Sequence, residues 1–208
     1  MPKADLAHPR FKTVAFIAQC KTIVLHCARS LLHRVMQKNH ALIAAAERLF
    51  DTNGYTATGM DRLTQAAGMS SRTLYKHFGS KAAIMGLVLA DRDRRFMESI
   101  NLQSVDALFA AIEDWVRKEG ARGCLFLRSL AETGGETSEI AAAVITHKAA
   151  FRKRISEIIA ADLGHDDPVL AEQMLVLAEG AIHAAVYRGV AAVAAARSAA
   201  ALLMDAAR

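Results

Sequence analysis

The sequence predicts an all-α protein, and three observations support this fold class. Only three of its 208 residues are proline, at positions 2, 9 and 168, so glycine is the only helix breaker between residues 10 and 167. Alanine, a strong helix former, is abundant, and the alternation of β-branched and polar residues that is typical of strands is scarce. A chain of this length can bury a core in one large or two small domains.

The first helix is expected over residues 39–52, where apolar side chains recur at three- and four-residue spacing. This buried stripe consists of Leu42, Ile43, Ala46, Leu49 and Phe50. Gly54 is expected to end the helix and Tyr55 to pack beneath the helices that come next.

Residues 54–81 predict two short helices, about 60–67 and 71–78, joined by a tight turn. Thr58 is expected to cap the first of them in a Thr-x-x-Asp pattern with Asp61, and Gly68 to end it in a left-handed conformation. Ser70 is placed to cap the second helix. A helix, a glycine turn and a short second helix form the layout of a helix-turn-helix DNA reader.

At these residues the sequence resembles the TetR/AcrR family of bacterial transcriptional regulators. The matching positions are Ala45, Ala46, Leu49, Phe50, Gly54, Tyr55, Thr58, Ala67, Gly68, Met69, Ser70, Thr73, Leu74, Tyr75, His77, Phe78 and Lys81. The resemblance implies an N-terminal helix-turn-helix DNA-binding domain (39–81), followed by a larger helical effector-binding and dimerisation domain (82–208). It also implies a cytoplasmic homodimer, most simply a ligand-responsive repressor that binds a palindromic double-stranded operator.

The second helix of the motif is expected to lie in the major groove. Its outward candidates are Ser71, Arg72, Thr73, Lys76 and His77. Arg72 is the best base reader, because a guanidinium can bond two acceptors on a guanine edge. Thr58, Tyr75, Lys76 and Lys81 suit phosphates, and the resemblance implies backbone contacts for Thr58, Tyr75 and Lys81. The alternative is that Tyr75 and His77 only help to close the small domain.

Residues 1–38 form a basic N-terminal extension of doubtful authenticity. They carry a net charge of +6, whereas the rest of the chain carries −1, so the high pI is no strong argument for DNA binding. Their apolar runs are too short to span a bilayer, and without a cleavage site export is not expected. Because family members usually begin shortly before their first helix, one hypothesis is that translation starts at Met36. The rival is a basic arm that contacts the DNA backbone.

A long helix at about 81–99 is expected to link the DNA-binding domain to the body. The body is expected to contain five more helices, at about 105–118, 124–132, 138–163, 168–188 and 190–206. Pro168 suits the first position of its helix. The last two helices are the expected dimer interface, which the resemblance implies to be a four-helix one. The apolar stripe assigned to it consists of Met174, Leu177, Ala178, Ala181, Ile182, Ala185 and Val186. The alternative is that this stripe is ordinary intramolecular core.

Apolar side chains of the body are candidates for an effector pocket, since family members bind small molecules there. They are Met85, Leu89, Phe109, Trp115, Cys124, Phe126, His147 and Phe151. The alternative is again that these residues form core, because aromatic and Met positions at helical spacing usually do. The chemistry of the effector does not follow from the sequence.

No catalytic motif or phosphate-cradling loop appears, so an enzyme is not expected, and neither is a cofactor. Cys20, Cys27 and Cys124 lack zinc-type spacing, which predicts no metal site and a reduced compartment. The expected partners are operator DNA, a small-molecule effector and a second copy of the chain, with no membrane. The alternative function is a helical small-ligand-binding or interaction protein without a functional operator.

Overall fold

The computed structural model describes residues 40–100 and 104–208. The chain divides into two units, residues 1–42 and 43–208, and the second unit holds the helix-turn-helix and the body. The predictions for residues 1–38, including Cys20, Cys27 and Met36, lie outside the described residues.

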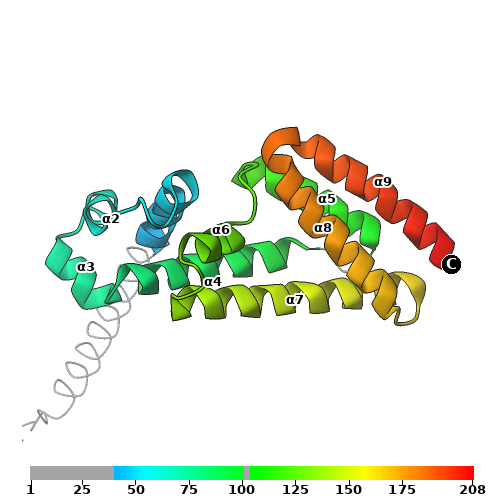
Figure 1. The fold of residues 1–208 in the computed structure, drawn as a ribbon, viewed down its shortest axis with the longest axis horizontal. Coiled ribbons are helices and arrows are strands. Elements are labelled where there is room, and N and C mark those ends of the chain that lie inside the picture. The colour runs from blue at the N-terminus through cyan, green and yellow to red at the C-terminus, as the bar shows by residue number, and fades with distance from the viewer. Residues whose placement is uncertain (1–39, 101–103) are drawn as a thin grey trace, which may run out of the picture. The chain divides into compact units, whose positions relative to one another are not determined.

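The predicted helix-turn-helix is present (Figure 1). The first helix is described over residues 40–53, followed by α2 (Met60–Ala67) and α3 (Ser71–Phe78). Phe50, Leu63 and Leu74 are fully buried and close the small core between these helices. Gly68 ends α2 with φ of 60°, and its N–H bonds back to the last turn of α2. The glycine turn is therefore confirmed, because this left-handed conformation costs a residue with a Cβ more than glycine.

The predicted caps are confirmed for Ser70 and wrong for Thr58. Ser70 Oγ accepts a hydrogen bond from the backbone N–H of Thr73 at 3.2 Å. The residue that caps α2 is Gly59, without a side-chain bond. The hydroxyl of Thr58 is buried instead and donates to the carbonyl of Gly54 at 2.7 Å. It therefore serves the loop before α2 and leaves the helix uncapped.

The other helices agree with the predicted ranges to within one residue. They are α4 (Lys81–Ser99), α5 (Val105–Glu119), α6 (Leu125–Glu132), α7 (Ser138–Leu163), α8 (Pro168–Arg188) and α9 (Val190–Ala207). Figure 1 shows α4 beside α7, and α8 between α7 and α9. The division at residues 81 and 82 into a reader domain and a body stays a prediction; this boundary falls where α4 begins.

The main core lies between α4, α5, α7, α8 and α9. Most of the stripe predicted for dimerisation belongs to it: Met174, Ala178, Ala181 and Ala185 are buried. These four assignments are corrected to intramolecular core, because side chains that are already covered have no surface left for a second chain. Leu177 and Ile182 are half-buried, and only Val186 is exposed.

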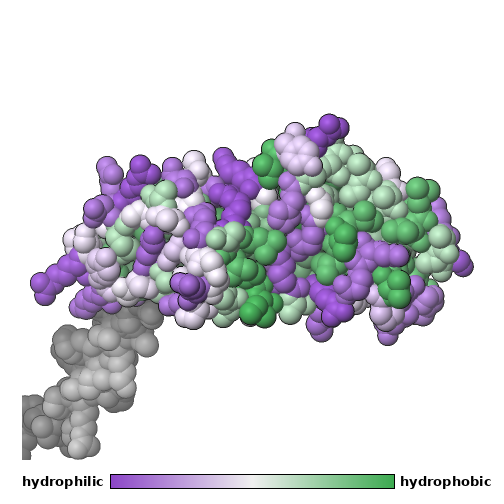
Figure 2. All heavy atoms as spheres, in the orientation of Figure 1, coloured by the Kyte–Doolittle hydropathy of each residue, from purple (hydrophilic) through white to green (hydrophobic). Residues whose placement is uncertain are grey.

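A different face of α8 and α9 is apolar and uncovered (Figure 2). Its large side chains are Val169, Val176, Val186, Tyr187 and Leu202, each more than half exposed. Both helices are also long and apolar enough, by length and composition alone, to cross a membrane. Since one face of each packs into the main core, we regard them as helices of a folded body.

Candidate nucleic-acid interface and ligand pocket

The outer face of α3 carries four of the five residues predicted to reach bases. Ser71, Arg72, Lys76 and His77 are exposed. Leu74 points the other way and anchors α3 to the core. The helix contains no acidic residue, so this face is polar and cationic. Such a surface can donate hydrogen bonds both to base edges and to phosphates.

Thr73 and Tyr75 differ in how freely they can reach a partner. Thr73 is half-buried, and its hydroxyl lies 2.8 Å from Ser70 Oγ within the cap of α3. Tyr75 is 51% exposed, and its phenol is available to a phosphate. Thr73 is thus first a part of the cap, whereas Tyr75 keeps the position expected for a backbone contact.

Two of the residues predicted to bind phosphate make internal contacts. Thr58 is fully buried, so its predicted phosphate contact is contradicted by the structure. Lys81 lies at the start of α4, where its Nζ donates to the carbonyl of Tyr55 at 3.0 Å and lies 4.3 Å from the centre of the Tyr55 ring. The ammonium therefore ties α4 to the loop after the first helix. Its remaining donors leave a phosphate contact open.

Three carboxylates join the reader helices to the body: Asp51 is buried, Glu47 is half-buried and Glu132 is exposed. Asp51, on the first helix, is bonded by Arg122 at 2.9 Å and by Arg128 at 3.0 Å. Glu132 of α6 accepts the backbone N–H of Thr56 at 2.8 Å. Ion pairs that are shielded from water are stronger than surface pairs, so the two Asp51 contacts couple the first helix to α6 and the loop before it.

The third carboxylate, Glu47, also lies on the first helix and is shared by two arginines of α4. Arg92 Nη1 is 2.6 Å from Glu47 Oε1, and Arg95 Nη2 is 2.7 Å from both oxygens. Both arginines also pair with Glu119 at the end of α5. One cluster of charges therefore joins the first helix, α4 and α5.

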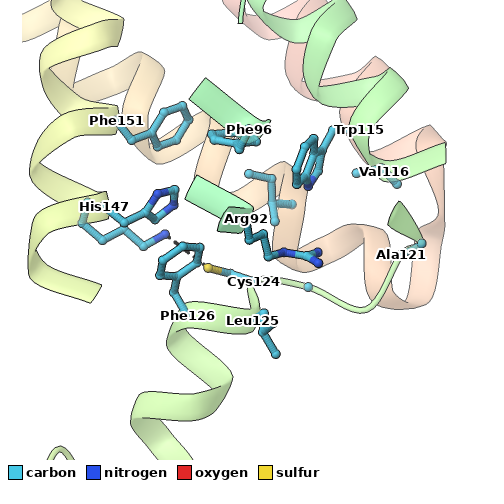
Figure 3. Close-up of a pocket in the computed structure, with 14 residues that line it drawn as sticks. Arg92, Phe96, Trp115, Val116, Ala121, Cys124, Leu125, Phe126, His147 and Phe151 are labelled. Atoms are coloured by element: carbon cyan, nitrogen blue, oxygen red, sulfur yellow. Dashed lines mark hydrogen bonds between the residues drawn. The ribbon is translucent and has the colours of Figure 1, made fainter. Parts of the chain in front are cut away.

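The body contains a narrow pocket between α4, α5, α6, α7 and α8 (Figure 3). Its empty volume is about 520 Å³, part of which is open solvent. The volume available to the centre of a water molecule is only about 40 Å³. That corresponds to a few water molecules. Five of the predicted residues line it: Trp115, Cys124, Phe126, His147 and Phe151.

The other three predicted pocket residues do not line it. Met85, Leu89 and Phe109 are fully buried in the packing of α4 and α5, so these assignments are corrected to core. Sequence reasoning missed Arg92, Phe96, Lys148 and Ile182, which do line the pocket. Arg92 had a signal: it stands four residues after Val88 and four before Phe96, on the buried face of α4.

The polar side chains of the pocket are fixed by hydrogen bonds, ring stacking and an ion pair. His147 Nδ1 lies 2.7 Å from Asp93 Oδ1, and its ring stacks on Phe126 with 3.9 Å between centroids. Burial lowers the pKa of His147, although the hydrogen bond with Asp93 opposes this shift. Lys148 Nζ pairs with Glu179 at 2.6 Å and lies 3.5 Å from Cys124 Sγ. Within residues 40–100 and 104–208, no cluster of His, Cys, Asp and Glu suits a metal ion.

Known proteins resemble the part of the chain that contains the helix-turn-helix. Residues 42–88 match the family described as bacterial regulatory proteins, tetR family. An uncharacterized HTH-type transcriptional regulator of Mycobacterium tuberculosis H37Rv is 28% identical over 141 residues, which are 64% of this chain and 66% of that protein. The regulator UidR of Escherichia coli K12 is 30% identical over 106 residues, 49% of this chain and 54% of UidR. The chain thus spans between half and two thirds of these relatives' length.

The likeness to solved structures extends over the body. The crystal structure of SCO4454, a TetR-family transcriptional regulator from Streptomyces coelicolor, has a TM-score of 0.74 and 24% identity. The match covers 82% of this chain and 95% of that one. At this identity the match establishes the shared all-helical fold, in which the helix-turn-helix precedes a helical body.

Proposed function

We propose that this chain is a bacterial transcriptional regulator of the TetR family, which binds a palindromic operator as a homodimer and releases it when a small molecule occupies the body. The family consists of regulators and is not enzymatic. Since the operator is chromosomal, the proposed location is the cytoplasm. Repression is the simplest outcome when a protein occupies promoter DNA and an effector removes it.

The observation that carries this proposal is the exposed face of α3. Arg72, Lys76 and the hydroxyl of Ser71 all point away from the core, on a short helix that is fixed behind by Leu74 and the Gly68 turn. We assign base reading to Arg72 and phosphate contacts to Tyr75 and Lys76. Ser71, Thr73 and His77 stay secondary candidates, and Lys81 stays a candidate phosphate contact.

A single α3 covers only a few base pairs, so two copies are needed to read two half-sites. We propose that the exposed apolar face of α8 and α9 supplies the interface, with Val169, Val176 and Tyr187 of α8 and Leu202 of α9 at its centre. Leu177 and Val186 border this face, whereas Ile182 lines the pocket and is not assigned to the interface. An apolar face of this kind is the usual mark of a protein interface.

The dimer is tested by charge substitution on that face. Val176→Glu and Tyr187→Glu are expected to shift the chain to monomers, because a second copy would bury the new carboxylate without a partner. Light scattering after size exclusion measures the mass. Ile145→Glu is the matched control, since Ile145 is as exposed as these residues but lies on α7. Monomers of the parent protein, or equal effects of all three changes, contradict the proposal.

The DNA-binding function is tested by footprinting the purified protein on the intergenic DNA upstream of its gene. Arg72→Ala is expected to cost about 1–3 kcal/mol on the operator and much less on unrelated DNA. Lys76→Ala is expected to weaken both and to reduce the salt slope by about 1. Lys118→Ala, an exposed lysine of α5, is the control. Without any footprint, the alternative of a helical ligand-binding protein lacking an operator is favoured.

A further inference from the structure

The charged groups that line the pocket are both cationic. Arg92 and Lys148 are among its 14 lining residues, and no Asp or Glu is among them. His147 adds no charge near neutral pH, because burial lowers its pKa. Each cation is paired with a glutamate that does not line the pocket, Glu47 or Glu179, so an anion in the pocket binds to the donors that these pairs leave unused.

The guanidinium of Arg92 is the group best placed to hold that anion. Arg92 is only 6% exposed. In Figure 3 its guanidinium lies between Trp115 and the Cys124–Leu125 segment. Only Nη1 makes a hydrogen bond to the described residues, which leaves the Nε and Nη2 donors without a partner among them. A buried guanidinium with unused donors binds an acceptor that enters the site, and a carboxylate matches two such donors.

The rest of the pocket is aromatic. Phe96 meets the Trp115 ring edge to face, with 5.1 Å between centroids, and also packs edge to face against Phe151. Phe126 and the ring of His147 complete this wall. Such surfaces favour a flat ring, since aromatic pairs gain energy beyond the area that they bury. The space between these side chains holds only a few water molecules, so a ring enters when they move apart.

We propose that the effector is a small aromatic carboxylate whose ring lies against Trp115 and Phe96 and whose carboxylate takes Arg92 from Glu47. This inference rests on the proposed function and names the ligand class and the regulation of the same pocket. The ligand carboxylate uses Nε and Nη2, so it acts on Glu47 through charge: two carboxylates on one guanidinium repel each other and share one positive charge, which favours release of the Glu47 pair.

The competition explains how an occupied pocket changes the reader helices. Glu47 belongs to the first helix, so loss of Arg92 removes one of the two arginines that hold that helix to α4. The loop at residues 120–124 also lines the pocket, and its Arg122 bonds Asp51 of the first helix. A ligand that prefers the arrangement with Arg92 released thereby disfavours the arrangement that fits DNA.

The test uses the fluorescence of Trp115, the only tryptophan in the chain, in the full-length protein without DNA. Three probes separate charge from shape: benzoate, benzamide as its neutral isostere, and cyclohexanecarboxylate as an anion without an aromatic ring. Benzoate is expected to bind at least about tenfold more tightly than either of the other two. Equal binding of benzoate and benzamide, or no saturable signal with benzoate, overturns the proposal.

Two substitutions with opposite expected effects locate the anion. Arg92→Met is expected to weaken benzoate binding at least about tenfold, whereas Glu47→Gln is expected to strengthen it severalfold by removing the competitor. Arg95→Met is the matched control: Arg95 lies 5.6 Å from the same indole and pairs with the same glutamate, but it does not line the pocket. If Arg92→Met does not fold, as judged by circular dichroism, Glu47→Gln decides; unchanged or weaker binding by Glu47→Gln overturns the proposal.

Operator release is measured separately, by footprinting with and without benzoate. Benzoate binding that leaves the footprint unchanged overturns the coupling through Glu47. Absence of any footprint without benzoate counts against the proposed DNA-binding function and not against the anion site. The two failures are therefore distinguishable.

Discussion

At the scale of the residue, several polar side chains have a second role beside the one that their type suggests. The hydroxyl of Thr58 is used inside the loop before α2, and the ammonium of Lys81 is used on Tyr55. Residue type and spacing cannot reveal this, because both groups are equally suited to a phosphate or to a nearby carbonyl. Arg92 is the clearest case, since it serves both Glu47 and the pocket.

Thr58→Val tests the internal role of this hydroxyl. The change keeps the shape and removes the bond to the Gly54 carbonyl, so we expect the free energy of unfolding to fall by about 1 kcal/mol. Operator affinity is expected to stay within about twofold, because a buried hydroxyl does not reach a phosphate. Urea denaturation and footprint titration measure the two quantities. An unchanged stability with a large loss of affinity would restore the phosphate contact.

His147 is expected to make the stability pH-dependent. Burial lowers its pKa in the folded state, so below its unfolded value of about 6.5 the unfolded chain binds more protons. Stability therefore falls as the pH drops below about 6.5, until the folded pKa is passed. His147→Gln is expected to reduce this fall, as measured by melting temperature between about pH 7 and pH 5. His165→Gln, at an exposed histidine, is the control; if both variants keep the full dependence, His147 is not its source.

At the scale of the element, local rules account for nearly all of the helix boundaries. The ends of α2, α3, α7 and α8 lie at glycines with positive φ, and α8 begins with Pro168 after the cap by Asp167. These signals act within a few residues, so the sequence alone predicts them. Which face of an element is covered is a different matter, and α8 shows it. Its apolar residues occur on more than one face, and only the packing decides that Met174 is core and Val176 is surface.

Gly68→Ala tests the turn of the helix-turn-helix. A Cβ added here meets nothing within 4 Å, so the cost is that of the left-handed backbone alone, about 1–2 kcal/mol. Gly86→Ala, inside α4, is the control with the opposite sign, since its nearest neighbour is 3.9 Å away and alanine favours a helix by about 0.5–1 kcal/mol. Chemical denaturation of both variants checks the pair. Equal losses would mean that the glycine in the turn has no conformational role.

At the scale of the whole molecule, the reader helices and the body are joined by a few shielded ion pairs on the first helix. Glu47 pairs with α4, and Asp51 pairs with Arg122 and Arg128 near α6. The same α4 and the same loop line the ligand pocket. Binding in the body and the position of the first helix are thereby coupled through named contacts. Distances along the chain of more than 40 residues separate these partners, which is why sequence patterns did not predict them.

Asp51→Asn tests this junction. The carboxylate is buried and bonds two arginines, and hydrogen bonds to charged groups contribute about 1.5–3 kcal/mol each. Because Arg122 is half exposed, we expect a total loss of about 2 kcal/mol in the free energy of unfolding. Asp114→Asn, in an exposed pair with Lys118, is expected to cost less than about 1 kcal/mol. Similar small losses in both variants would show that the junction is held by other contacts.

The sequence by itself determined the all-helical class, the position of each helix and the cationic outer face of α3. Caps, glycine turns and apolar spacing act over a few residues, so a short stretch of sequence is enough to predict them. Only the tertiary structure decided which apolar stripe of α8 stays uncovered, that Thr58 and Lys81 make internal contacts, and that Arg92 stands between Glu47 and the pocket. These outcomes depend on residues that meet only when distant helices pack, and each polar group then takes the partner that burial leaves within reach.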